Sequence, residues 1–144
     1  MITSLREGED AEWLRMRRAL WPDCSEAMHQ VEIAERRANG SAVFVYRRES
    51  GSLGAFIEVS VRNRVDGSLS PRVAYVEGWF VDEDLRHRGI GRELIGQAEA
   101  WAKANGLTEL ASDAELENAE SIAAHHALGF QETFRLVHFI RPIT

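Results

Sequence analysis

Two glycines stand among three arginines in the stretch LRHRGIGREL, directly after the apolar run VAYVEGWFV. A helix that begins near Gly89 would leave its first backbone N–H groups without intrahelical partners, and its dipole would favour an anion there. Gly89 and Gly91 lack the Cβ atoms that would hold a ligand away from this backbone. Three side chains would add charge-assisted donors around the same point: Arg86, Arg88 and Arg92. The junction therefore predicts a diphosphate cradle, with a glycine-rich turn bearing solvated arginines as the alternative.

Known phosphate motifs narrow this prediction. The dinucleotide fingerprint needs a third glycine where Leu94 stands, and the Walker ending Gly-Lys-Ser/Thr is absent. The pattern Arg/Gln-x-x-Gly-x-Gly/Ala fits the six residues from Arg86 through Ile90 to Gly91. This stretch resembles the pyrophosphate loop of the GNAT superfamily, the acyl-CoA-dependent N-acyltransferases. The family pattern continues downstream with Asn118, with His125 seven residues later, and with Gly-Phe at 129–130.

Further stretches resemble one branch of that superfamily, the aminoglycoside 6′-N-acetyltransferases. They cover most of the chain from residue 20 onward: LWPD, SVRNRVDGSLSP, VEGWFV, LASDAELEN and HHALGFQET. His125 is the most telling residue, because this branch has His where other GNAT enzymes carry Tyr. The resemblance implies transfer of acetyl from acetyl-CoA to the 6′-amino group of an aminoglycoside, by direct attack in a ternary complex. It implies acetyl-CoA as cosubstrate. No metal is expected, because the histidines show no ligand spacing with Cys24 or carboxylates.

The resemblance also assigns roles to residues. Backbone groups of Phe80 and Val81 would bind the pantetheine arm like an added strand, and an amide of this pair could donate to the thioester oxygen. The pyrophosphate would lie on the amides around Arg88–Arg92, and Asn118 would hydrogen-bond the pantetheine arm. His125 would either protonate the departing thiolate or contact the cofactor by stacking.

A polycationic substrate requires carboxylates. Glu77 interrupts an apolar strand, two residues before Trp79, and Asp113 ends the neighbouring stretch LASD. Both would bind the ammonium group, and either could relay its proton through water. The alternative for a strand carboxylate is a solvated or ion-paired side chain. Trp21 would flank the acceptor, because an exposed indole offers a flat face to a sugar ring, and Trp79 would line the same site.

Both helices and strands are predicted around these residues. Helical spacing and caps predict helices after Asp10, over Ser25–Gly40, from Gly89 to Gly106, and from Asn118 to Gly129. Apolar and β-branched runs predict strands at six places: Ile2–Leu5, SAVFVYR, LGAFIEVSV, VAYVEGWFVD, LTELASD and the final FRLVHFI. This order predicts an α/β (α+β mixed) fold: a GNAT-like, mostly antiparallel twisted sheet flanked by helices.

The composition predicts one soluble domain over residues 1–144, with 44% hydrophobic and 28% charged residues. The net charge of −6 argues against general nucleic-acid binding, and no apolar run is long enough for a membrane span. The polar N-terminus and the single Cys24 favour a cytoplasmic protein. The apolar stretch LVHFI would suit a homodimer.

Two other functions stay open at this point. One is a GNAT acetyltransferase for a polyamine, another small amine or a protein N-terminus. The other is a non-catalytic acetyl-CoA-binding module.

Overall fold

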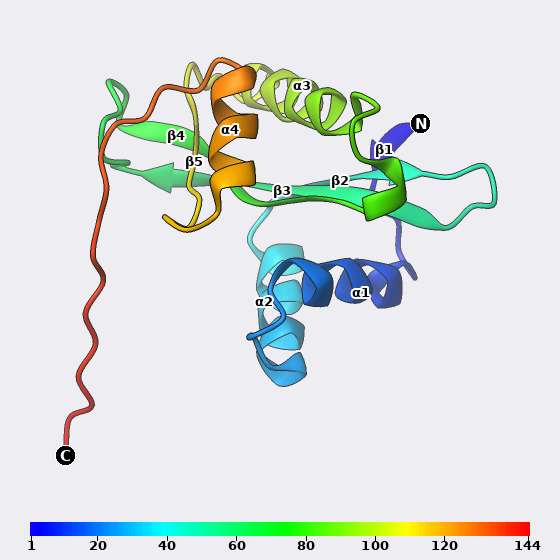
Figure 1. The fold of residues 1–144 in the computed structure, drawn as a ribbon, viewed down its shortest axis with the longest axis horizontal. Coiled ribbons are helices and arrows are strands. Elements are labelled where there is room, and N and C mark those ends of the chain that lie inside the picture. The colour runs from blue at the N-terminus through cyan, green and yellow to red at the C-terminus, as the bar shows by residue number, and fades with distance from the viewer. The chain divides into compact units, whose positions relative to one another are not determined.

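The computed structural model describes residues 1–144, and their contacts divide them into two compact units, Met1–Asp113 and Ala114–Thr144. The first unit holds one five-stranded sheet in the order β1-β2-β3-β4-β5 (Figure 1). Its neighbouring strands are antiparallel except for β4 and β5, which are parallel. The bounds are β1 Ile2–Ser4, α1 Asp10–Leu20, α2 Glu26–Ala38, β2 Ala42–Arg47, β3 Leu53–Asn63, β4 Arg72–Val81, the 3₁₀ turn η1 Glu83–Leu85, α3 Ile90–Ala104 and β5 Leu110–Ser112. The predicted fold class, a mixed and mostly antiparallel sheet with flanking helices, is confirmed.

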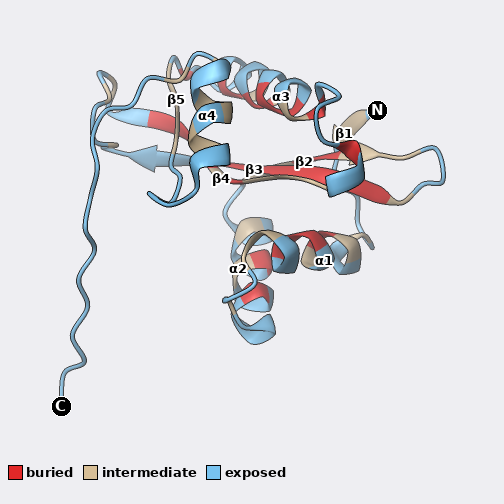
Figure 2. Ribbon diagram, viewed as in Figure 1, coloured by how far each residue is buried: buried red, intermediate tan, exposed pale blue.

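Helices cover both faces of this sheet: α1 and α2 lie on one face and α3 on the other (Figure 1). β3 is therefore buried continuously from Leu53 to Ser60, as expected for a strand packed on two sides (Figure 2). Trp13 and Met16 of α1 are fully buried, as are Leu94 and Ala98 of α3, because residues three or four apart share one helix face. The sheet is thus held rigidly from above and below.

The helix ends mostly follow the predicted caps. The Ser25 hydroxyl accepts the N–H of Met28 at 3.1 Å and opens α2. Gly89 takes φ +82° at the start of α3, a conformation that costs glycine little. The expected cap at Asp10 is wrong, because Glu9 holds the capping position and Asp10 is the first helical residue. β3 also extends two residues beyond the predicted strand LGAFIEVSV, to Asn63.

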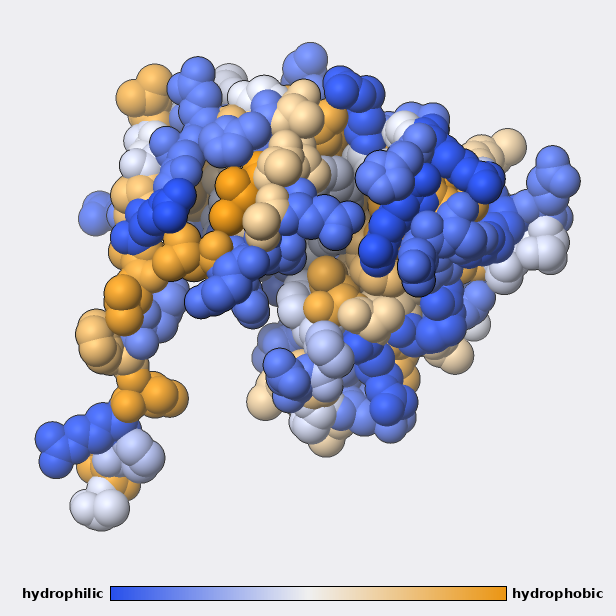
Figure 3. All heavy atoms as spheres, in the orientation of Figure 1, coloured by the Kyte–Doolittle hydropathy of each residue, from blue (hydrophilic) through white to orange (hydrophobic).

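The second unit contains one helix, α4 Ala119–Ala127, followed by an extended segment. Gly129 takes φ +88° just after α4, as its sequence predicts. The predicted final strand Phe134–Ile140 is wrong for this chain, since those residues form no strand and lack a partner for a ladder. Their apolar side chains are exposed, with Phe139 at 92% and Ile140 at 99% (Figure 3). None of the helices is long and apolar enough to cross a membrane.

Candidate functional site

The sheet opens between its two parallel strands. The pairing of β4 with β5 ends at Val76 and Ser112, while β4 continues to Val81. Along this continuation β4 remains paired with β3 on its other side. One edge of β4 is therefore left without a strand partner, next to the turn that leads into α3.

Antiparallel alternation decides which backbone groups reach that edge. The N–H of Asp82 donates to the carbonyl of Gly54 at 2.8 Å, which fixes the phase of the ladder. In the observed register, the backbone of Phe80 then points toward β3, whereas Trp79 and Val81 point toward the open edge. Of the expected pair, the register directs Val81 toward the open edge and turns Phe80 away from it, and Trp79 points the same way as Val81.

A β-bulge separates the open part of β4 from the paired part. Val76 pairs with Val59 and Gly78 pairs with Glu58, so Glu77 is an extra residue with no partner opposite it. Bulges bend a strand and re-aim side chains, and they are frequent next to active sites. Glu77, which was predicted as a site residue because it interrupts the apolar strand, is thus also the extra residue of the bulge.

Glu77 lies within a dense set of donors. Its carboxylate accepts the Ser60 hydroxyl at 2.6 Å and two bonds from Arg62 at 2.6 and 2.8 Å, and Arg36 lies at 3.5 Å. Burial alone would raise the pKa of the Glu77 carboxyl, but these donors outweigh burial and hold the pKa below its ordinary value. Glu77 is therefore charged and ion-paired, as the alternative interpretation expected, while its partner Arg62 is half-exposed.

Asp113 joins the same cluster through Tyr75. The Tyr75 hydroxyl donates to Asp113, and the Arg62 guanidinium lies 3.6 Å from the centre of the Tyr75 ring. Burial and the Asp113 carboxylate both raise the pKa of Tyr75, so its hydroxyl stays protonated. The structure therefore brings the two predicted carboxylates into one cluster, with Tyr75 and Arg62 between them.

Four members of this cluster were not predicted from the sequence: Arg36, Ser60, Arg62 and Tyr75. Strand alternation could have predicted part of the cluster, because residues two apart on a strand lie on the same face. This places Ser60 and Arg62 on one face of β3. In the same way, Tyr75 and Glu77 lie two residues apart on β4. The bulge disturbs this alternation, so only the pairing register reveals the contacts.

The two tryptophans lie differently from the prediction. Trp21 is half-buried rather than exposed: its ring stacks on His29 at 6.2 Å and meets Phe56 edge-on at 6.5 Å. A Cβ built on Gly78 would lie 2.6 Å from the Trp21 ring, so this indole packs directly beneath the bulged strand. Trp79 instead lies beside α3, because a Cβ built on Gly91 would come within 3.1 Å of its ring.

The glycine–arginine loop has the geometry expected of an anion cradle. Gly89 precedes the first turn of α3, and a Cβ built there would meet nothing within 4 Å, so this backbone is open to a ligand. The N–H groups of the first helical turn have no partners within the helix. Three exposed arginines belong to this loop and to the first turn of α3: Arg86, Arg88 and Arg92. These residues fit a diphosphate group.

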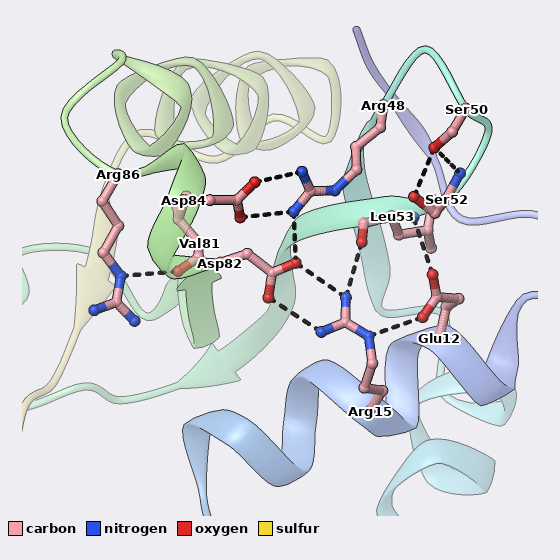
Figure 4. A network of polar contacts seen from close by, with 10 residues as sticks. All are labelled: Glu12, Arg15, Arg48, Ser50, Ser52, Leu53, Val81, Asp82, Asp84 and Arg86. Atoms are coloured by element: carbon pink, nitrogen blue, oxygen red, sulfur yellow. Dashed lines mark hydrogen bonds and ion pairs between the residues drawn. The ribbon is translucent and has the colours of Figure 1, made fainter.

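An ion-pair network fixes the turn between β4 and this loop (Figure 4). Arg48 binds Asp84 through two bonds of 2.7 and 2.9 Å and also reaches Asp82 at 3.0 Å. Arg15 of α1 makes two bonds of 3.1 Å to Asp82 and one of 2.9 Å to the Leu53 carbonyl. The end of β4 is therefore attached to the β2–β3 hairpin and to α1.

The second unit holds the two downstream motif residues. The Asn118 side chain accepts the N–H of Ser121 at 3.0 Å and caps α4. His125 Nδ1 lies 2.7 Å from the Ser121 carbonyl, so this nitrogen carries the proton, and the ring meets Phe130 edge-on at 5.2 Å. Both have local structural roles, and their expected cofactor contacts stay predictions.

One cluster of possible metal ligands was not foreseen, while the expectation of no metal stays a prediction. Cys24, His29 and Glu32 have ligand atoms within 4.8 Å of one another, although their sequence spacing gave no sign of it. Arg17 enters this cluster: it forms an ion pair with Glu32, and its Nε donates to His29 Nδ1 at 3.3 Å. The guanidinium thus already supplies a positive charge among these three side chains.

The chain is similar to acetyltransferases by sequence. Residues 5–130 match the profile of the Acetyltransferase (GNAT) family. An aminoglycoside N(6′)-acetyltransferase type 1 from Klebsiella aerogenes is 37% identical over 147 residues, which cover 99% of this chain and 97% of that protein. The protein of the same name from Serratia marcescens is 41% identical over 133 residues, or 91% of each chain.

Solved structures agree. The aminoglycoside 6′-N-acetyltransferase AAC(6′)-IG from Acinetobacter haemolyticus superposes with a TM-score of 0.91 at 36% identity, covering 100% of this chain and 99% of that one. The structure of AAC(6′)-Iy with the bisubstrate analog CoA-S-monomethyl-acetylneamine gives a TM-score of 0.90 at 31% identity, covering 99% of this chain and 98% of that one.

Proposed function

Because the chain belongs to the GNAT family of acetyltransferases, we propose that it transfers acetyl from acetyl-CoA to the 6′-amino group of an aminoglycoside. The observation that carries the proposal is the edge of β4 beyond its pairing with β5, which has the glycine-lined start of α3 at one end and the Glu77–Asp113 cluster at the other. Such an edge can bind an extended cosubstrate arm between a phosphate cradle and an acceptor site.

The donor side uses backbone groups more than side chains. The N–H and C=O groups of Trp79 and Val81 would bind the pantetheine arm, and the amides from Ile90 to Arg92 would bind the diphosphate. Bound acetyl-CoA supplies the activated thioester. Asn118 and His125 are included as contacts of the arm because the family pattern implies them.

The acceptor side divides its work between two carboxylates. Glu77 binds a substrate ammonium group, because its lowered pKa keeps it charged and makes it a poor proton acceptor. Asp113 accepts the proton released by the attacking amine through a water molecule, while the Tyr75 hydroxyl holds the carboxylate in place. Trp21 supports this site from beneath Gly78.

An acetylation panel tests the proposal. The purified protein should release CoA thiol with kanamycin, tobramycin or gentamicin, and mass spectrometry should place one acetyl group on the 6′-nitrogen. Acetylation of spermidine or short peptides alone would instead favour the other GNAT activity. Tight binding of acetyl-CoA without turnover on any amine would favour a non-catalytic module.

The cellular and assembly aspects are part of the same proposal. We expect a cytoplasmic enzyme, a single catalytic domain over residues 1–144, and no nucleic-acid or membrane partner. We also expect a homodimer, supported by the exposed apolar side chains of Phe139 and Ile140. Sedimentation velocity tests the dimer. A raised inhibitory concentration of kanamycin in a susceptible strain that expresses the protein tests a role in antibiotic resistance.

A further inference from the structure

The side chain of Arg86 occupies a hydrogen-bonding position on the open edge of β4. Its Nε donates to the Val81 carbonyl at 3.0 Å (Figure 4). Its guanidinium lies 6.0 Å from the centre of the Phe80 ring. The ladder alternation directs that carbonyl away from β3, toward the edge where an amide of the pantetheine arm would bind. Arg86 and the arm therefore compete for one acceptor.

Hydrogen bonds hold the backbone around this contact in place, so only the Arg86 side chain can move away from the Val81 carbonyl. Asp82 is bonded to Gly54 through its N–H and to Arg15 and Arg48 through its carboxylate. The N–H of Leu85 donates to the Asp82 carbonyl at 2.9 Å and closes the turn. Arg86 itself is exposed, and its side chain has no other hydrogen bond in the structure.

A phosphate group would draw Arg86 away. Arg86 lies three residues before Gly89, whose open backbone begins the anion cradle. A guanidinium and a phosphate carry opposite charges and can form two parallel bonds, so their contact is stronger than the single bond from the guanidinium to a neutral carbonyl. A donor that carries a diphosphate thus frees the Val81 carbonyl for its own arm, whereas a donor without phosphate has to displace Arg86 unaided.

We propose that Arg86 sets the selectivity for the acetyl donor, by capping the Val81 carbonyl until a diphosphate takes the guanidinium. This inference rests on the proposed function, because it assigns the arm and the diphosphate to the same edge and cradle. It makes Arg86 an attractive contact for acetyl-CoA and an obstacle to a phosphate-free thioester.

The test compares two donors and two arginines. Acetyl transfer to kanamycin is measured with acetyl-CoA and with S-acetylpantetheine, and binding of CoA and of pantetheine is measured by calorimetry. Arg86→Ala is expected to weaken CoA binding about 5-fold, through loss of a phosphate contact, and to strengthen pantetheine binding about 5-fold, through loss of the cap. Arg88→Ala, an exposed arginine of the same loop, is the matched control: it should weaken CoA binding without the gain for pantetheine.

Opposite effects on the two ligands in Arg86→Ala alone would support the inference. If the wild-type protein binds CoA and acetylates kanamycin, but Arg86→Ala weakens both ligands or leaves pantetheine unchanged, the selectivity role is overturned and the proposed function stands. The same gain for pantetheine in Arg88→Ala would also overturn it. A wild-type protein that binds neither ligand would overturn the proposed function, and this inference with it.

Discussion

Glu58→Gln is expected to destabilise the protein far more than a loss of one surface charge would. Glu58 is fully buried in β3, and one carboxylate oxygen accepts the Trp13 indole N–H at 2.9 Å and a bond from Arg17. Arg36 lies 3.5 Å from the other oxygen. Arg17 is only 1% exposed, so removing the charge of Glu58 leaves a guanidinium buried with a single remaining ion pair, to Glu32.

The size of the effect follows from that burial. Breaking one side of a buried ion pair costs about 3–5 kcal/mol. The remaining pair with Glu32 favours the lower end, about 3 kcal/mol, because the buried guanidinium keeps one carboxylate partner, even though solvent weakens this pair at the 37% exposed Glu32 side chain. At about 3–4 °C per kcal/mol for a chain of this length, the midpoint of thermal unfolding should fall by about 10 °C.

Urea unfolding followed by far-UV circular dichroism, together with calorimetry, measures this loss. Glu99→Gln makes the same change at an exposed position of α3 and should unfold like the wild type. The double variant Arg17→Met/Glu58→Leu should recover more than half of the loss, because apolar side chains of similar size replace buried ion pairs well. An unfolding free energy of Glu58→Gln that equals that of Glu99→Gln would refute the reasoning.

Three further predictions concern the site. Tyr75→Phe removes the hydroxyl that holds Asp113, so the unfolding free energy should fall by about 1 kcal/mol. The KM for the aminoglycoside should rise about 5-fold, while the KM for acetyl-CoA stays constant. Because the folded-state pKa of Glu77 lies below its ordinary value of 4.5, its contribution to stability should be complete above about pH 4.5. That contribution should disappear as the pH falls through the folded-state pKa, so calorimetric curves of the wild type and Glu77→Gln should converge in acid. Gly78→Ala should lower the free energy of urea unfolding by about 1–3 kcal/mol, because its Cβ would lie 2.6 Å from a carbon of the Trp21 indole. A Cβ at Gly96 meets nothing within 4 Å, so Gly96→Ala is the control and should not destabilise α3.

Each of these has a contrary outcome. Equal increases of both KM values in Tyr75→Phe would mean a general distortion instead of a local one at Asp113. A constant stability difference between the wild type and Glu77→Gln down to pH 3 would contradict the lowered pKa. Equal stability of Gly78→Ala and Gly96→Ala would show that the Trp21 ring yields without cost.

Local signals in the sequence were sufficient for most elements. The Ser25 cap and the Asn39-Gly40 ending predicted α2, and Gly89 predicted the start of α3, because caps and left-handed turns depend on neighbouring residues alone. The final strand failed for the opposite reason: Phe134–Ile140 has strand-like residues, but a strand also needs a partner, which its own sequence does not reveal.

In the site, too, contacts between neighbouring residues were predictable and contacts between distant residues were not. The loop around Gly89 was predictable because consecutive residues build it. The partners of Glu77 were not, since Arg36 and Arg62 come from a helix and a strand that only the sheet register brings together. The cluster of Cys24 and His29 around Arg17 was missed for the same reason.

The bulge at Glu77 has a consequence for how this enzyme can diversify. It divides β4 into one half that contains Tyr75 and another that contains Val81, and each half has its own side-chain phase. Under the proposed function the first half lines the acceptor site and the second binds the donor, so replacements before the bulge are expected to alter the acceptor site without disturbing the hydrogen bonds to the coenzyme. One extra residue would then let a single strand serve two ligands independently.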